Sequence, residues 1–209
     1  MTMGDENLFA SMSMPLVINP ILDKLEQTKD MAAAQSLRAA FLKVEQLHPG
    51  FAYDLIKGVL RQAEVLGAID MAESLLRLEG ISPSDEFRIM RSEEAFHHLN
   101  GRATALKKIL SRIPDEIDER KKFLDTIKDI ASAIRDLLDA VNSVMVYIEG
   151  QPNKQALEQR KREFVKYSKR FSNTLKEFFR ENHKHQVFLS ANYLINQTNM
   201  ILRTVQHSS

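Results

Sequence analysis

Two Glu-x-x-His pairs are the residues of this chain that most resemble metal ligands. Glu45 precedes His48 and Glu94 precedes His97, so the members of each pair would share one helix face. In di-iron helical bundles such pairs face a common core, where further glutamates complete the metal site. The apolar seams of this chain contain no such glutamates. We therefore interpret both pairs as parts of solvated, charged surfaces.

Sequence motifs for other catalytic chemistry are missing from the chain. It contains no glycine-rich phosphate loop, no Gly-x-Ser-x-Gly and no His-Glu-x-x-His. The absence of Cys excludes disulfides and thiolate metal sites. A net charge of +1, no Trp and inward-facing aromatic residues argue against nucleic acid as a partner. We expect a protein that is not an enzyme and that uses no metal and no cofactor.

Two basic stripes on consecutive long helices indicate a binding surface instead. Counting from the expected turn near Gln151 places Lys128 level with Lys176, and Arg135 level with Lys169. Cations would then flank a floor of small residues, which suits an incoming acidic helix that brings leucines to the floor. The stripes consist of Lys128, Ala131 and Arg135 on one helix, and of Lys169, Ser172 and Lys176 on the next.

Two other interpretations of the same charge remain open at this point. The stripes can be an ordinary solvated face of a basic bundle. They can also belong to a surface that attracts anionic phospholipid headgroups, since cations are dense along the second helix. Those cations are Arg160, Lys161, Arg162, Lys166, Lys169 and Arg170.

The charge distribution divides the chain into two modules. Residues 1–93 carry a net charge of −5, whereas residues 94–209 carry +6. Such an asymmetry indicates modules with different partners. We expect an N-terminal helical dimerisation domain over residues 1–81, a linker over 82–94 and a C-terminal four-helix bundle over 95–209.

The C-terminal module is expected to be an antiparallel bundle of long helices, and the whole chain to be all-α. One helix should run from about Asp115 to Ile148 and the next, after the turn at 150–153, to about Asn182. A helix of uncertain continuity up to about Arg112 precedes them, and a last helix follows them. The first seam consists of Phe123, Ile127, Ile130, Ile134, Leu137, Val141 and Val144; the second of Leu157, Phe164, Phe171, Leu175 and Phe178.

The N-terminal module has shorter helices and a marginal core. We expect a helix over 15–26 interrupted at Pro20, one capped by Asp30 and ended by residues 48–50, and one over 51–64. Asp70 should cap a fourth, and residues 82–84 should break the chain and start the next helix. The module either packs on the bundle or pairs with a second copy or a homologous domain, and we favour pairing.

The N-terminus and the hydropathy of the chain indicate a cytoplasmic protein. Asp5 and Glu6 stand where a secretory signal needs positive charge, and no apolar run approaches the length of a transmembrane helix.

Several long strings in the chain resemble the programmed cell death protein 10 family, also called the cerebral cavernous malformation 3 protein family. They extend over almost the whole chain and are densest in the bundle. The strings are residues 36–41 (SLRAAF), 73–77 (ESLLR), 109–117 (ILSRIPDEI), 126–138 (TIKDIASAIRDLL), 163–176 (EFVKYSKRFSNTLK), 190–192 (SAN) and 196–202 (NQTNMIL).

The resemblance implies a fold and a set of partners. The N-terminal domain would form homodimers, or heterodimers with class III germinal centre kinases. The bundle would be similar to the focal adhesion targeting domain and would bind paxillin-type leucine-aspartate motif helices, malcavernin and striatin, with phosphoinositide binding as a further property. It also implies roles in kinase signalling, apoptosis and angiogenesis, and Golgi and peripheral plasma-membrane pools of a cytoplasmic protein.

The resemblance also carries over to individual residues. The family's groove positions match both basic stripes, with Arg135 in place of a lysine. Val59 replaces an isoleucine of the dimerisation face, and Gly58 departs from the family pattern at a cost of about 1 kcal/mol in a helix interior. The dimerisation face corresponds to Leu37, Ala40, Val59 and Leu60, with Phe41 and Val44 as their neighbours.

Overall fold

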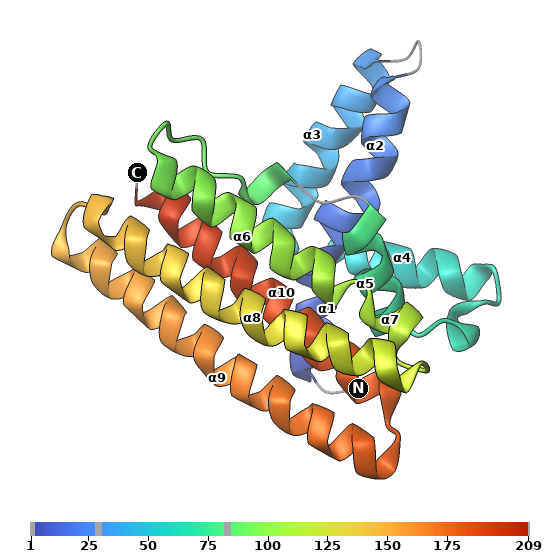
Figure 1. Cartoon of the computed structure of the whole chain (residues 1–209). Helices are drawn as coiled ribbons and strands as arrows, with labels where there is room; N and C mark the ends of the chain where they lie inside the picture. The colour runs from blue at the N-terminus through green and yellow to red at the C-terminus, as the bar shows by residue number, and fades with distance from the viewer. Residues whose placement is uncertain (1–2, 28–30, 82–84, 209) are drawn as a thin grey trace. The chain divides into compact units, whose positions relative to one another are not determined.

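The computed structural model of the chain is all-helical, which confirms the predicted fold class (Figure 1). It describes residues 3–27, 31–81 and 85–208, and no strand occurs among them. The chain divides into two compact units, an N-terminal unit Met1–Ser84 and a C-terminal unit Asp85–Ser209. None of the helices in the described residues combines the length and the apolar character needed to cross a bilayer.

The N-terminal unit consists of short helices with buried apolar residues on several of them. One buried cluster consists of Ile18, Leu22 and Ala52, with Phe41 and Ile56 among the half-buried residues packed against it. Further buried side chains come from α1, η1 and α5, and they include Phe9, Leu16, Leu75 and Leu76. The elements are α1 (Met3–Ser13), the π-helical turn η1 (Met14–Ile18), α2 (Asn19–Glu26), α3 (Met31–Leu47), α4 (Phe51–Gln62), the 3-10 turn η2 (Leu66–Ala68) and α5 (Met71–Ile81).

The start of this unit differs from the prediction. Helical structure begins at Met3 rather than at Pro15, and it continues through Pro20 to Glu26. The wider turn η1 lies between α1 and α2, and Pro15 and Pro20 are the second residues of η1 and α2. Since the chain is already helical at Ser13 and Ile18, these are not free helix starts, and the wider π-helical turn accommodates the prolines without ending the helix.

Two predicted helix boundaries in this unit agree with the structure, because local chemistry sets them. Asp70 caps α5, since its Oδ1 accepts hydrogen bonds from the amides of Ala72 at 2.9 Å and Glu73 at 3.2 Å. The α3 helix ends at Leu47, before Gly50 adopts a positive φ of 95°. The cap predicted at Asp30 and the break predicted at 82–84 lie outside the described residues.

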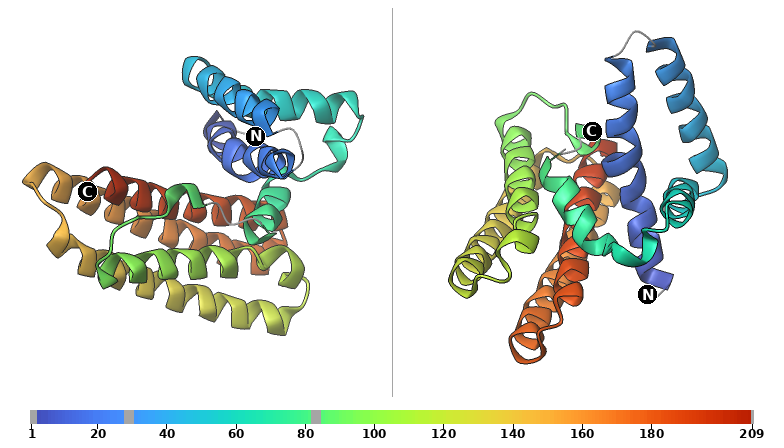
Figure 2. Two further views of the ribbon diagram at one scale, coloured as in Figure 1. Left: turned by 90° about the horizontal axis from the view of Figure 1, so that it is seen from above. Right: turned by 90° about the vertical axis from the view of Figure 1, so that its right-hand side faces the viewer.

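The long helices α6, α8, α9 and α10 of the C-terminal unit form a bundle (Figures 1 and 2). Helix α8 packs most closely on α6, and α9 packs on α10, which also contacts α6. The approach between α8 and α9 is less extensive. The elements are η3 (Asp85–Phe87), α6 (Glu94–Leu110), α7 (Ile113–Glu116), α8 (Arg120–Val144), η4 (Met145–Tyr147), α9 (Gln151–Glu181) and α10 (Lys184–His207).

The helix predicted over 115–148 is wrong as a single element. The chain forms the short α7, leaves helical geometry at Glu119 with φ −98° and ψ 90°, and enters α8 only at Arg120. Ile113 and Ile117 are buried. These two side chains reach the core while the chain reverses between α6 and α8, so the reversal needs a turn of its own.

The predicted apolar seam of α9 is confirmed, because all its members are buried. The seam of α8 is confirmed only in part. Ile127 and Ile134 are half-buried, whereas Thr126 and Ala133 are buried. The physical reason is that α8 turns its inner face toward α6 and leaves the side nearer α9 more open.

Candidate partner-binding surfaces

The residues of the predicted groove all lie exposed on α8 and α9. Two contacts set the register of these helices. Lys161 Nζ of α9 donates to Asn142 Oδ1 of α8 at 3.0 Å, and near the other end the Phe123 and Phe179 rings lie 6.0 Å apart. The helices are therefore antiparallel neighbours along most of their length.

Counting along the helices from these two contacts aligns the groove residues. Ala131 is level with Ser172 between two levels of cations. Each helix separates its cations by seven residues, which is two turns or about 10 Å. The upper and lower levels pair Lys128 with Lys176 and Arg135 with Lys169.

The cations of this groove differ in how far they are already paired. Lys128 Nζ lies 2.8 Å from Asp125 Oδ1. This hydrogen bond lowers the pKa of Asp125 and raises the pKa of Lys128. Within the described part of the chain, Arg135, Lys169 and Lys176 have no ion pair, so their charges are available to a partner.

An apolar stripe on α8 runs along the groove beside these cations. Its members follow one another in steps of three and four residues, so they share one helix face with Ala131. Leu124 is 40% exposed, and the isoleucines are half-buried. Sequence reasoning assigned the isoleucines to the core and missed both leucines. The stripe consists of Leu124, Ile127, Ala131, Ile134 and Leu138.

The predicted dimerisation residues divide between surface and core. Leu37, Ala40 and Val59 are exposed, whereas Val44 and Leu60 are half-buried. Phe41 is also half-buried. Its side chain packs against the buried cluster that contains Ile18, and its ring lies 6.1 Å from that of Phe51.

The exposed apolar surface of α3 and α4 is larger than sequence reasoning proposed. Leu47 is 66% exposed, and Val59 on α4 is 59% exposed. Exposed aliphatic side chains that recur along one helix face make these two helices a candidate interaction surface. The α3 stripe consists of Ala33, Leu37, Ala40, Val44 and Leu47, and the α4 stripe of Phe51, Leu55 and Val59.

The two Glu-x-x-His pairs have other surroundings than a metal site. Glu45 accepts hydrogen bonds from the amides of Gly50 at 2.6 Å and Ala52 at 2.9 Å, so its carboxylate caps α4. Glu94 and His97 are both exposed. No group of three or more potential ligand residues gathers anywhere in the described ranges.

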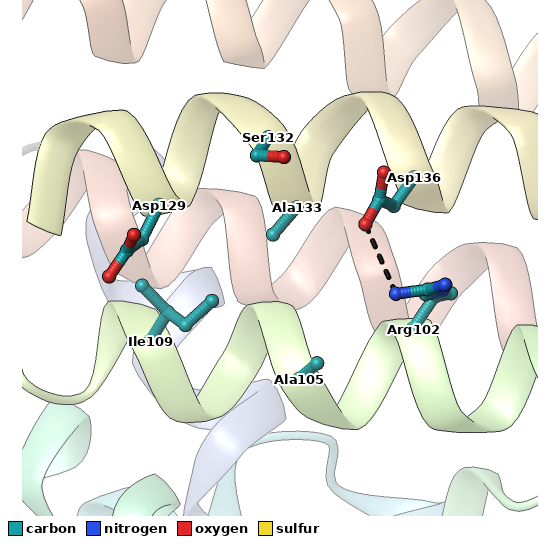
Figure 3. A pocket seen from close by; sticks show the side chains of 7 residues that line it. All are labelled: Arg102, Ala105, Ile109, Asp129, Ser132, Ala133 and Asp136. Atoms are coloured by element: carbon teal, nitrogen blue, oxygen red, sulfur yellow. Dashed lines mark hydrogen bonds and ion pairs between the residues drawn. The ribbon is translucent and has the colours of Figure 1, made fainter.

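A trough between α6 and α8 was not foreseen from the sequence (Figure 3). Its volume is about 240 Å³. Arg102 pairs with Asp136 at 3.1 Å across one end, and Arg112 pairs with Asp129 at 3.4 Å near the other. The lining consists of Arg102, Ala105, Ile109, Asp129, Ser132, Ala133 and Asp136.

Comparisons with known proteins match most of the chain, although the C-terminal family model ends before the groove residues of α9. Residues 6–66 match a family model described as programmed cell death protein 10, dimerisation domain. Residues 69–158 match a model described as programmed cell death protein 10, C-terminal. A Caenorhabditis elegans protein, programmed cell death protein 10 homolog, is 40% identical over 204 residues, covering 93% of this chain and 93% of that protein. The dimerisation match contains the exposed stripes of α3 and α4.

Proposed function

Because this chain belongs to the programmed cell death protein 10 family, whose members are non-enzymatic adaptors, we propose that it joins two kinds of partner. Its N-terminal unit pairs with a second copy or with a class III germinal centre kinase. Its C-terminal unit docks acidic, leucine-rich partner helices between α8 and α9. The observation that carries the docking role is a partly exposed apolar stripe on α8 beside Arg135, Lys169 and Lys176, which have no ion pair within the described residues.

The docking mechanism follows from the dimensions of the groove. A partner helix lying along it would bring leucines to the α8 stripe and its closest backbone approach to Ala131 and Ser172. Acids seven residues apart on the partner would meet both levels of cations. Paxillin-type leucine-aspartate motifs have this character, and we extend the proposal to helices of malcavernin and striatin, which the family resemblance implies.

The dimerisation role is supported by the apolar stripes of α3 and α4, which have no cover within the described residues of the N-terminal unit. A second helical domain packing on them would bury aliphatic side chains at roughly 25 cal/mol per Å² of apolar surface. A partner with small residues opposite Ala33 and Ala40 can approach α3 closely. We propose a cytoplasmic adaptor in kinase signalling, with Golgi and plasma-membrane pools.

A pair of matched variants tests the docking role. The groove variant, Lys169→Glu with Lys176→Glu, reverses the two groove charges of α9. The control variant, Lys108→Glu with Arg203→Glu, makes the same charge change at exposed positions of α6 and α10. Binding of a fluorescent leucine-aspartate peptide is measured by anisotropy. We expect the groove variant to bind at least about tenfold more weakly. Equal affinities of the two variants would exclude the groove.

A second candidate function is binding of anionic phosphoinositides through the same helix. Lys166 and Lys169 are exposed on α9, which supports it. Lys161 and Arg162 are less available, because both contact Glu158. Sedimentation with liposomes tests this candidate, which predicts binding that needs anionic lipid and fades with salt.

A further inference from the structure

Ser172 lies midway between Lys169 and Lys176 on α9, at the centre of the surface that we propose as the docking groove. It is exposed, and its hydroxyl donates a hydrogen bond of 3.1 Å to the carbonyl oxygen of Ser168. Ala131 lies level with it on α8, so no large side chain covers it from that position. The hydroxyl is thus an accessible group at the point where a partner helix would come closest.

The charges around Ser172 favour an added anion. Residues three and four positions away are the nearest neighbours on a helix face, and for Ser172 they include Lys169 and Lys176. The other two such positions hold Ser168 and Leu175, so no acid on α9 competes for these lysines from that face. Neither lysine has an ion pair within the described ranges.

We propose that Ser172 is a phosphorylation site and that its phosphate closes the groove to acidic helices. This inference rests on the docking function proposed above. Phosphoserine carries a charge of about −1.5 to −2 at neutral pH, enough to neutralise Lys169 and Lys176. The phosphate would also fill the space above Ala131. An incoming acidic helix would then lose cation partners, meet a like charge and be held away from the floor.

The sequence before Ser172 indicates the class of enzyme that modifies it. Lys169 and Arg170 lie three and two positions before the acceptor, as protein kinases that select basic residues require. The Ser172 Oγ forms a bond to the γ-phosphorus of ATP, the bond from that phosphorus to the bridging oxygen breaks, and ADP leaves. The hydroxyl proton passes to the base of the kinase. Because Ser172 lies inside α9, the kinase must capture a locally opened segment.

A matched serine provides the control for the phosphate. Ser143 is an exposed serine inside α8 whose hydroxyl also bonds to the carbonyl four residues earlier, at 3.0 Å from Asp139 O. Ser143 lies seven residues, or two helical turns, after Asp136, which pairs with Arg102 of α6. Both residues therefore lie on the side of α8 that faces α6. The full chain is prepared with phosphoserine at position 172 or 143, and also as Ser172→Asp and Ser143→Asp. Circular dichroism melting identifies any variant that fails to fold.

Binding of the leucine-aspartate peptide then tests whether phosphorylation of Ser172 blocks docking. We expect phosphoserine 172 to weaken binding at least about tenfold and phosphoserine 143 to change it less than about twofold. If the chain with phosphoserine 172 binds the peptide as the unmodified chain does, while Lys169→Glu with Lys176→Glu loses affinity, the proposed phosphorylation switch is wrong. The proposed docking function is then still supported. If neither change affects binding, the docking function itself is wrong.

A kinase reaction tests the site independently of peptide binding. The folded full chain is incubated with ATP and the catalytic domain of a kinase that selects basic residues, and phosphate is located by mass spectrometry. We expect incorporation at Ser172, at a rate limited by local opening of α9. A free peptide of residues 163–181 serves as the positive control. Modification of that peptide without any modification of Ser172 in the folded chain would overturn the assignment.

Discussion

Replacing Glu45 by Ala should destabilise the surface that α3 and α4 present for dimerisation. The carboxylate accepts the amides of Gly50 at 2.6 Å and Ala52 at 2.9 Å, which are orphan donors at the start of α4. Hydrogen bonds to charged acceptors contribute about 1.5–3 kcal/mol when buried. Glu45 is only half-buried, so the measured range for helix caps, about 0.5–2 kcal/mol, is the better guide.

The assay follows the amides themselves. At fixed protein concentration, hydrogen exchange at Gly50 and Ala52 should accelerate by about tenfold for each 1.4 kcal/mol lost. The melting temperature of the N-terminal unit should fall by roughly 4–8 °C per kcal/mol. Glu45→Gln, which keeps one acceptor oxygen, should lie between wild type and Glu45→Ala. The control is Gln46→Ala, an exposed neighbour on α3.

The comparison with Gln46→Ala makes the prediction refutable. If Glu45→Ala and Gln46→Ala show the same exchange rates at Gly50 and Ala52, the carboxylate does not cap α4. A fall in melting temperature without faster exchange at these amides would point to another cause for the lost stability. Either outcome would remove the physical link between Glu45 and the turn that joins α3 to α4.

Other substitutions test the remaining contacts. Asp125→Asn should free Lys128 and strengthen peptide binding by about two- to threefold, measured by anisotropy; unchanged binding would mean that the pair does not compete with a partner. Lys128→Ala should raise the pKa of Asp125 in an NMR titration, because the hydrogen bond and the charge of Lys128 that lower this pKa are removed. In the unmodified chain the ion pair is present at neutral pH and is lost as the pH falls through the lowered pKa of Asp125. Leu37→Asp with Ala40→Asp should give a monomer by light scattering, and a dimer that persists at low micromolar concentration would refute that face. Phe123→Ala, which empties a fully buried ring site, should cost the bundle about 3–5 kcal/mol in denaturant unfolding, and a loss below 1 kcal/mol would contradict the packing.

Features governed by short-range chemistry could be predicted from the sequence. The α9 seam from Leu157 to Phe178 repeats at helical spacing, and burial follows it throughout. Asp70 caps α5 because a carboxylate before a helix bonds to the amides just after it, whatever the rest of the chain does. The cations of the groove were found in the same way, because three- and four-residue steps place residues on one helix face.

Features governed by distant neighbours could not be predicted. Pro20 was expected to interrupt a helix, but the π-helical turn before it lets the chain remain helical. Glu45 gave no sign of capping, because the amides it binds lie beyond a turn whose geometry depends on Gly50. Ile127 and Ile134 look like core residues in any periodic pattern. Their half-burial appears only once α8 is seen to pack on α6.

The sequence alone therefore determined the all-helical class, the charge of the two modules and the residue types on each helix face, because these depend on composition and on the 3.6-residue period. Tertiary structure alone decided which face of each helix was covered. Burial depends on which neighbour a helix packs against, and that choice is settled by the sum of many non-local contacts. The open side of α8, with its apolar stripe beside Arg135 and Lys169, is a product of that choice.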